Sequence, residues 1–454
     1  MNKFLAGILD FSKHQIVPDD KFVRFAFQYN LPNLETLFES LKIIDCLFFF
    51  SKPSDAGKFL SIGSIKDVNI DELVAKISAG NFESNFIIDA NHSLQIPNYI
   101  PLVLGAAKFP SDKNECGWNG FSDSKWFIPQ VLLYEDSTSS FIIFHYFGNK
   151  PPIDFFERVI ISITKSSTET KQSKTRFELL HSTEIERWTN AVNFALNEIR
   201  NNNIEKVVLA RKIQLKLKSC FSISFALLQL QHKYLDCATF AYKEKDATFF
   251  GSTPEKLFSL NGKVLETEAL AGSISRGLNN EEDLIKEKKL LNDTKEMNEH
   301  KNVLSFLIER LEKFTENVSC ALQPQIKKLY NIQHLQTHIT AKLKDEVGIL
   351  ELQKAIHPTP AVCGLPQKNA LELIKELEYF ERGLYAGVIG WFNEKKRAEF
   401  FVGIRSALLK ENILTAFAGS GIVEGSDPIS EYYETELKLR PILSLLENEI
   451  INQS

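Results

Sequence analysis

Runs of apolar residues divide the chain into strand-like segments separated by polar loops. Three runs in the first 180 residues predict strands, at 43–50, 125–134 and 140–147. Four more predict strands at 206–217, 384–392, 398–409 and 412–419. Between two shorter apolar runs, Asn261-Gly262 is the strongest type of short-range hairpin signal. Much of the chain is therefore expected to form sheets of hairpin-connected strands.

Apolar positions three and four residues apart predict helices between these groups of strands. A capping box of Thr183 and Glu186 precedes a helix that is expected to end near Asn201, and a long helix is expected over 281–313. A further helix follows Asp427, which suits the N-cap, and Pro428, which suits the first helical position. Because the helices are grouped between runs of strands, we predict an α+β fold with large antiparallel sheets rather than repeated βαβ units.

A polar segment at 165–175 has the composition of an exposed linker. It divides an N-terminal part, residues 1–180, from a region at 183–446 that holds the remaining motifs. A chain of 454 residues predicts two domains or one large layered domain. We expect the N-terminal part to contribute strands to the sheets.

Two glutamates of the long helix lie on its apolar side. At 100° per residue, Glu296 and Glu299 share a stripe with Val303 and Phe306. An isolated buried carboxylate costs several kcal/mol unless it is paired, protonated or bound to a metal. Either the helix turns this part of the stripe toward solvent, or the two carboxylates have a partner.

The helix after Pro428 repeats the Glu-x-x-Glu spacing. Glu431, Glu434 and Lys438 share one stripe, whereas Glu436 lies nearly opposite and is expected to be an ordinary residue of a solvated helix face. Carboxylates without His or Cys companions suit a hard divalent ion such as magnesium, which needs only one or two direct protein ligands. The same spacing is also common on solvated helices, so both interpretations stay open on spacing alone.

Charge and composition exclude several classes of partner. The 53 basic and 58 acidic residues give a net charge of -5, and no basic block is present, so nucleic acid is not expected. Apolar runs are far shorter than the roughly 20 residues of a membrane span, and the N-terminus lacks a signal-peptide pattern, so we expect a cytoplasmic protein without a membrane partner. Six cysteines without a C-x-x-C pair indicate reduced thiols.

Lys206, at the head of the run 206–217, has two possible roles. It either extends to solvent at a sheet edge or, if desolvated, has its pKa lowered from about 10.4 toward the 7 to 8 that a general base requires.

Nine motifs in order resemble the chorismate-utilising enzymes, and among them the isochorismate synthases. They are KVVLAR (206–211), GSTPEKL (251–257), LAGSISRG (270–277), NEH (298–300), HPTPAVCGLP (357–366), ERGLYAGVIGW (381–391), GIRSA (403–407), FAGSGIV (417–423) and EYYETELKL (431–439). The resemblance implies a two-lobed core of antiparallel sheets with peripheral helices and a magnesium-dependent site for chorismate.

The resemblance also implies a role for individual residues. Lys206 is the expected general base and Glu255 the general acid. Glu299 and Glu434 are the expected direct magnesium ligands, with Glu296 and Glu431 holding metal-bound waters. The expected substrate contacts are Gly272, Ser273, Gly419, Arg405 and Lys438, and the expected further pocket residues are His334, Thr359, Arg382 and Tyr385.

Two positions discriminate between reactions of the family. Relatives that add ammonia have Gln in place of Lys206, and relatives with a nucleophilic lysine carry it in place of Ala271, so the resemblance implies addition of water and no glutamine amidotransferase subunit. A monomer is expected, serving menaquinone or siderophore biosynthesis. Two alternatives stay open: a salicylate synthase, which eliminates pyruvate from isochorismate, and a non-catalytic module that binds an anion at the glycine-rich run 419–425.

Overall fold

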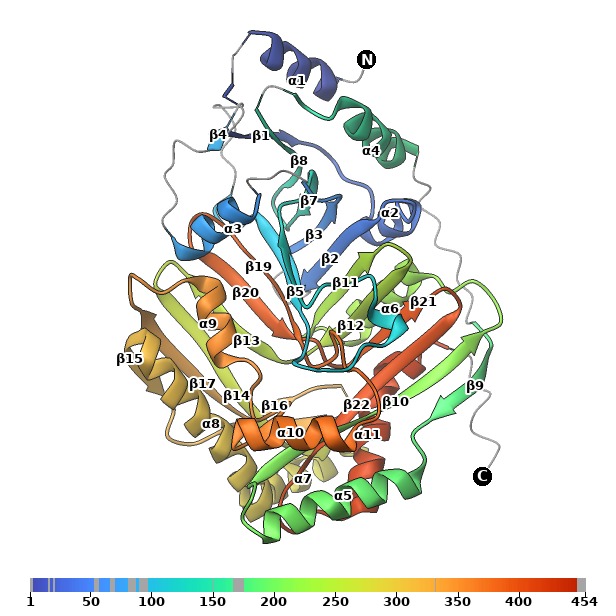
Figure 1. Cartoon of the computed structure of the whole chain (residues 1–454), viewed down its shortest axis with the longest axis vertical. Coiled ribbons are helices and arrows are strands. Elements are labelled where there is room, and N and C mark those ends of the chain that lie inside the picture. Colours follow the sequence, from blue (N-terminus) through green and yellow to red (C-terminus); the bar gives the residue numbers. More distant parts are fainter. Residues whose placement is uncertain are drawn as a thin grey trace.

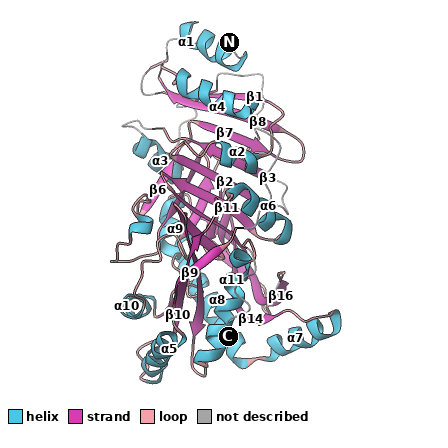
Figure 2. Cartoon of the chain, turned by 90° about the vertical axis from the view of Figure 1, so that its right-hand side faces the viewer, coloured by secondary structure: helices cyan, strands magenta, loops and turns pink. Residues whose placement is uncertain are grey.

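Two antiparallel β-sheets pack on each other and helices surround them, as Figure 1 shows. The computed structural model describes residues 3–14, 17–18, 21–52, 57–65, 70–80, 87–89, 97–148, 150–165, 175–330 and 332–446. Figure 2 shows the strands in the interior and the helices at the periphery. No helix in these ranges is long and apolar enough to cross a membrane. The predicted α+β class is confirmed.

The larger sheet has 13 strands in the described ranges and spans both parts of the chain. Its order is β18 (Gly364–Leu365), β10 (Lys206–Leu217), β22 (Ile413–Ile422), β21 (Ser406–Lys410), β12 (Ala247–Thr253), β11 (Ala238–Glu244), β2 (Cys46–Lys52), β3 (Gly57–Ile62), β7 (Val131–Glu135), β8 (Ser140–Phe147), β1 (Phe22–Gln28) and β4 (Ile87–Asp89), with β9 (Phe177–Ser182) beside β10. Neighbours run antiparallel except β1 and β4. The pair β10 and β22, near one edge of this sheet, is in register from Val207 opposite Ile422 to Lys216 opposite Ile413.

The smaller sheet has nine strands in the described ranges, and it also combines both parts of the chain. Its order is β15 (Thr315–Cys320), β17 (Ile332–Leu343), β14 (Val264–Ser275), β13 (Lys256–Asn261), β20 (Arg397–Val402), β19 (Val388–Phe392), β5 (Val103–Ala107) and β6 (Ser124–Phe127), with β16 (Gln325–Lys328) beside β17. The predicted Asn261-Gly262 hairpin joins β13 and β14, with Gly262 at a φ of 63° that favours glycine.

Helices cover the outer sides of the sheets. They are α1 (Lys3–His14), α2 (Leu34–Ser40), α3 (Ile70–Ala79), α4 (Ile153–Lys165), α5 (Ile185–Arg200), α6 (Ile223–Lys233), α7 (Asn280–Asn292), α8 (Thr294–Phe314), α9 (Ile349–Ile356), α10 (Gln367–Leu377) and α11 (Pro428–Leu443), with a 3₁₀ turn at Cys116–Trp118. Helix α11 begins as predicted, because the side chain of Asp427 accepts the backbone N–H of Ser430 at 2.8 Å and Pro428 is the first helical residue.

Alternating side chains of the larger sheet enter two separate cores. In β2, Phe48 and Phe50 belong to the core between the sheets, whereas Leu47 and Phe49 belong to the core beneath α1, α2, α4, α6 and α11. The ring of Phe50 lies 5.4 Å from that of Phe401 in the smaller sheet. Full burial of such a ring stabilises the fold by about 1.5 to 3 kcal/mol. The aromatic-rich runs therefore fix how the two sheets face each other.

Two predicted strands are each divided between the sheets. The run 125–134 forms β6 in the smaller sheet and β7 in the larger, because Pro129 lies between them and has no N–H for a ladder. The run 398–409 forms β20 and β21, and the chain crosses between sheets at Gly403–Arg405. Arg405 takes a φ of 52° at this crossing, and this backbone conformation sets the direction of its side chain.

Two helix predictions were wrong in detail. The helix expected over 281–313 is two helices, because Asp293 ends α7 and its carboxylate caps α8 by accepting the N–H groups of Lys295 and Glu296 at 3.0 and 3.1 Å. The capping box before α5 does not form, since Glu184 takes the N-cap position and the hydroxyl of Thr183 bonds to Tyr379 at 2.9 Å instead. The linker predicted at 165–175 lies mostly outside the described residues.

Candidate active site

A cavity of ≈ 90 Å³ lies between the two sheets, next to helices α8 and α11. Strands β10 and β22 of the larger sheet and β14 and β17 of the smaller contribute to its wall. The predicted site residues that line it are Glu255, Gly272, Ser273, Glu299, His334, Arg382, Tyr385, Arg405, Gly419, Glu434 and Lys438. Residues from distant parts of the sequence therefore meet at one cavity, as the motif order implied.

Arg405 places a buried, positively charged guanidinium at the cavity. Its side chain is buried, and Nη1 has no hydrogen-bond partner in the described part of the chain. Burial lowers the pKa of this guanidinium, although arginine stays protonated in proteins. A buried donor without a partner is unfavourable, and a planar guanidinium matches a carboxylate with two parallel hydrogen bonds. Arg405 is therefore suited to bind a carboxylate of a ligand.

Lys438 adds a second cation on the α11 side of the cavity. Its Nζ lies 2.6 Å from Glu434 Oε1 and donates to the backbone oxygen of Gly419 at 3.1 Å. Gly419 lets β22 lie close to its neighbours, since a Cβ there would lie 2.9 Å from the backbone oxygen of Leu209 and 3.0 Å from the hydroxyl of Tyr385. The ammonium is thus fixed at the cavity wall by α11 and β22 together.

Lys206 is fully buried at the start of β10 and is paired with a carboxylate. Its Nζ donates to Glu299 Oε1 at 2.7 Å. Of this pair Glu299 lines the cavity, and Lys206 is not among the lining residues. Gly421 on β22 provides the space for both, because a Cβ there would lie 3.0 Å from Lys206 Cε and 3.1 Å from Glu299 Oε1. The interpretation of Lys206 as a solvent-exposed edge lysine is excluded by its burial.

Glu255 follows β12 and lines the cavity as a partly protonated acid. Burial, followed by the nearby Glu268 carboxylate, raises the pKa of Glu255 to about 7, against the opposing effect of Lys206, Lys438 and Arg405. An acid with a pKa near the working pH is protonated often enough to donate and acidic enough to transfer its proton readily. Glu255 has the electrostatic environment that a general acid requires.

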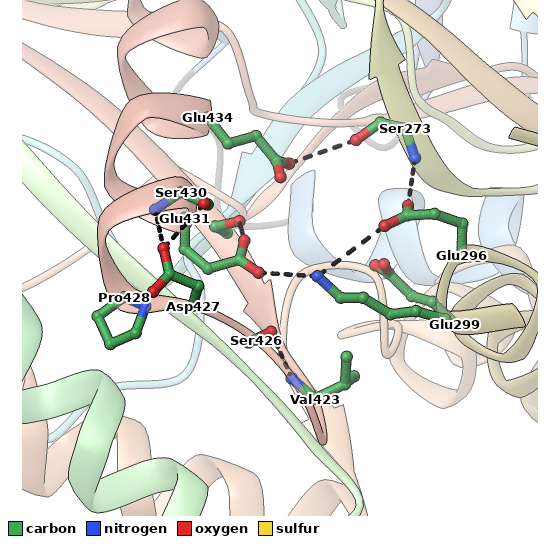
Figure 3. Close-up of polar contacts among 12 residues, drawn as sticks. Ser273, Glu296, Glu299, Val423, Ser426, Asp427, Pro428, Ser430, Glu431 and Glu434 are labelled. Atoms are coloured by element: carbon green, nitrogen blue, oxygen red, sulfur yellow. Dashed lines mark hydrogen bonds and ion pairs between the residues drawn. The ribbon is translucent and has the colours of Figure 1, made fainter. Parts of the chain in front are cut away.

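The four glutamates expected at the metal converge from two helices. Figure 3 shows Glu431 and Glu434 of α11 facing Glu296 and Glu299 of α8. The backbone N–H of Ser273 donates to Glu296 Oε2 at 2.6 Å, and its hydroxyl donates to Glu434 Oε1 at 3.3 Å. Ser273 of β14 thus forms a hydrogen bond with one glutamate of each helix. The helix wheel predicted the two pairs correctly, and the fold turns both toward the interior rather than toward solvent.

Lysine side chains neutralise part of this negative charge. Lys295, which the sequence analysis did not identify, donates to Glu431 Oε1 at 2.9 Å and lies 3.9 Å from Glu296 Oε1. Burial and the neighbouring Glu299 carboxylate raise the pKa of Glu296 to about 7. Although burial alone would raise it, the Lys438 ammonium holds the pKa of Glu434 well below its ordinary value.

The donor set of this cluster suits magnesium. Within the described ranges, no three Asp, Glu, His or Cys side chains are gathered closely enough to ligate one ion as they stand. Each of the four carboxylates has a hydrogen-bonding or ionic partner in this structure. Magnesium prefers such oxygen donors and retains several waters, so it needs only one or two of them directly. Glu299 and Glu434 are the two that line the cavity.

The remaining predicted pocket residues have different surroundings. Burial lowers the pKa of His334 to about 3, so this imidazole is neutral. Arg382 lines the cavity, but its guanidinium is held by Glu378 and by the backbone oxygens of Val362 and Val208 at 2.8 and 2.7 Å, so it supports the wall. Thr359 lines a smaller neighbouring cavity instead, where its buried hydroxyl has no hydrogen-bond partner among the described residues.

Glu436 is the most exposed of the three glutamates of α11, as expected, but it also has a buried partner. Its carboxylate forms an ion pair with Arg211 Nη2, and Arg211 is fully buried on β10. The guanidinium also donates to Thr435 Oγ1 at 2.5 Å and lies 4.1 Å from the ring centroid of Tyr432. The ion pair was not predicted, because the helix wheel shows which side a residue faces but not which buried cation lies there. The glycine-rich run 419–425 begins inside β22, which ends at Ile422.

Comparisons with known proteins agree with the motifs and the fold. The sequence matches the chorismate binding enzyme family over residues 12–447. It is 32% identical to isochorismate synthase MenF of Bacillus subtilis over 369 residues, which cover 80% of this chain and 78% of that protein. It is 38% identical to the salicylate biosynthesis isochorismate synthase of Pseudomonas aeruginosa over 256 residues, 56% of this chain and 54% of that protein.

A solved structure shows the same fold. The menaquinone-specific isochorismate synthase MenF from Escherichia coli matches with a TM-score of 0.79 and 21% identity, covering 98% of this chain and 99% of that one. The resemblance found in the sequence motifs is thereby confirmed. The chain belongs to the chorismate-binding enzyme family.

Proposed function

We propose that this protein isomerises chorismate to isochorismate in a magnesium-dependent reaction. The observation that carries the proposal is that Glu255 and Arg405 line the same cavity. Burial raises the pKa of Glu255 to about 7, and Nη1 of Arg405 has no hydrogen-bond partner among the described residues. Chorismate is a dicarboxylate that loses a hydroxyl group, so it requires both an anion site and a proton donor. The names of the two curated relatives described above support the same reaction.

In the proposed reaction, a water molecule attacks C2 of chorismate and the hydroxyl at C4 leaves. Lys206, acting as a neutral amine, accepts the proton of the attacking water. Glu255 donates its proton to the departing hydroxyl, which leaves as water while the double bonds shift. The proton gained by Lys206 and the proton lost by Glu255 are then exchanged with solvent, so the isomerisation is balanced. Lys206 is fully buried and Glu255 is partly buried at the cavity wall, which limits competing water.

The charged groups of the wall bind and orient the substrate. Arg405 is the partner we propose for one substrate carboxylate, with Lys438 as a second cation. We propose Glu299 and Glu434 as direct ligands of magnesium, and Glu296 and Glu431 as the residues that hold its waters. When bound, magnesium supplies positive charge for a substrate carboxylate. Release of Lys206 from Glu299 is required before it acts as a base, since the pair is joined at 2.7 Å.

Incubation of the purified protein with chorismate and magnesium, followed by chromatography, tests the proposal. Isochorismate is the expected main product, and Lys206→Ala should abolish its formation while the variant stays folded. Salicylate plus pyruvate as main products would overturn the isomerase proposal in favour of a salicylate synthase. No turnover by the wild-type protein would instead favour the anion-binding module.

We further propose that the protein has no amidotransferase subunit, because Lys206 stands where relatives that use ammonia carry Gln. We also propose that it acts as a monomer, as the family resemblance implies. The product would feed menaquinone or siderophore biosynthesis. A knockout strain distinguishes these routes, since loss of menaquinone and loss of siderophore give different nutritional requirements. Sedimentation of the purified protein measures the oligomeric state.

A further inference from the structure

The buried carboxylate of Glu268 lies near Glu255 and takes no part in the reaction proposed above. Glu268 is on β14 and is only 8% exposed. Lys327 on β16 donates to Glu268 Oε1 at 2.8 Å, and the Gln336 side chain on β17 donates to Oε2. Three neighbouring strands therefore fix the position and orientation of this carboxylate. A buried charge that is paired and hydrogen-bonded on both oxygens is held in one geometry.

Glu268 is connected to the general acid by geometry as well as by charge. Glu255 and Glu268 line the same small cavity of ≈ 10 Å³, together with Thr359. Lys327 Nζ also lies 3.4 Å from the backbone oxygen of Pro254, the residue before Glu255. The Lys327 ammonium thus contacts both the Glu268 carboxylate and the backbone next to Glu255, so displacement of Glu268 affects the position of Glu255.

The other charges around Glu255 act in the opposite direction. Lys206 of β10, Lys438 of α11 and Arg405 of the crossing segment all favour its ionised form. Glu299 and Glu434 also line the main cavity, but each is paired with a lysine. After burial, Glu268 is the largest influence that favours the protonated form of Glu255. Without it, the three cations would act on Glu255 against burial alone.

We propose that Glu268 is a positioning residue for Glu255: held by Lys327 and Gln336, it places a fixed negative charge behind the acid and keeps its proton available for the leaving hydroxyl. The inference rests on the proposed function, in which Glu255 is the proton donor. Glu268 contacts neither the substrate nor the metal in this proposal. Its effect is exerted through the protonation of Glu255.

The test is the pH dependence of kcat/KM for Glu268→Gln, measured from pH 5.5 to 9 with chorismate and saturating magnesium. Wild-type activity should decline above about pH 7 as Glu255 ionises, and Glu268→Gln should move this alkaline limb down by about one pH unit, the smallest shift typical of a nearby charge. Activity at pH 8 then falls about tenfold, whereas activity at pH 5.5 stays within about twofold. The matched control is Glu266→Gln, an exposed glutamate two residues earlier on β14, which should leave the limb in place.

A purely structural role would lower the thermal midpoint of Glu268→Gln without moving the limb, and that result overturns the inference. Glu268→Asp, which retains the charge, should show the alkaline limb of kcat/KM at the wild-type position. If Glu268→Gln does not fold, Lys327→Gln provides the second test, because the negative charge then loses its compensating cation and the limb should move to higher pH. A limb that stays at the wild-type position in Lys327→Gln also overturns the inference. Absence of isochorismate from the wild-type protein would instead contradict the proposed function.

Discussion

Replacing Glu255 by glutamine should stabilise the folded protein above neutral pH while abolishing the proposed reaction. The pKa of this carboxyl is raised by burial from an ordinary value of 4.5 to about 7 in the folded state. The folded protein therefore binds the proton more tightly than the unfolded chain does. The stabilisation from this proton is fully present below about pH 4.5 and is lost as pH rises through about 7. Glutamine has the shape of the protonated acid and cannot ionise.

The magnitude follows from the two pKa values. The ionisation of Glu255 opposes folding by about 0.8 kcal/mol at pH 5 and by about 3 kcal/mol at pH 8, where the difference between the two pKa values is almost fully expressed. For a chain of 454 residues, 1 kcal/mol corresponds to a change of about 1 °C in the unfolding midpoint. Glu255→Gln should therefore unfold about 3 °C above the wild-type protein at pH 8.

Thermal unfolding of both proteins, measured every half pH unit from 5 to 8 in metal-free buffer, checks this expectation. The difference between the midpoints should grow with pH and level off above about pH 7. Glu266→Gln, which removes an exposed carboxylate, should instead show no such growth. A constant difference across the range, or a wild-type protein that is the more stable one at pH 8, would refute the reasoning about burial.

Four further substitutions separate binding from folding. Glu434→Gln should weaken magnesium binding at least tenfold by calorimetry, whereas Glu436→Gln should leave it unchanged; equal effects on metal binding would contradict the assignment. Glu436→Gln should instead lower the free energy of unfolding by about 1 to 3 kcal/mol, because the buried Arg211 loses its carboxylate. Arg405→Lys should raise KM for chorismate about tenfold or more in steady-state kinetics, since lysine lacks the planar fork; an unchanged KM would exclude a carboxylate contact there. Gly272→Ala should lower the free energy of unfolding by about 1 to 3 kcal/mol, because Gly272 has a φ of 77° and a Cβ would lie 2.9 Å from the backbone oxygen of Glu296; unchanged denaturant unfolding would contradict this.

The sequence predicts the elements well where a local signal marks their ends. Strand 206–217, the Asn261-Gly262 hairpin and the start of α11 all agree with the structure. Each depends on residues that are adjacent in sequence: a continuous apolar run, a turn pair with positive φ, or a cap followed by proline. Where two strands follow each other in one apolar run, as at 398–409, no such local signal shows that the chain leaves one sheet and enters the other.

For the side chains of the site too, the sequence predicts only what a local pattern marks. The 100° helix geometry was sufficient to place Glu431 with Glu434, because both lie on one helix. The lysine that neutralises Glu431, the arginine that holds Glu436 and the carboxylate behind Glu255 all come from other elements. Charge partners that are distant in sequence have no periodic pattern, so only the folded chain identifies Lys295, Arg211 and Glu268.

The N-terminal part is joined to the catalytic region through both sheets. Strand β2 pairs with β11 from Ser51 opposite Thr239 to Cys46 opposite Glu244, and β5 pairs with β19 in the smaller sheet. Removal of the first 180 residues would expose the hydrogen-bonding edges of β11 and β19 together with their buried aromatic side chains. Open edges of this kind pair with other chains and aggregate. The boundary near residue 180 therefore separates motifs along the sequence but not independent hydrophobic cores, although the residues that line the cavity all follow it.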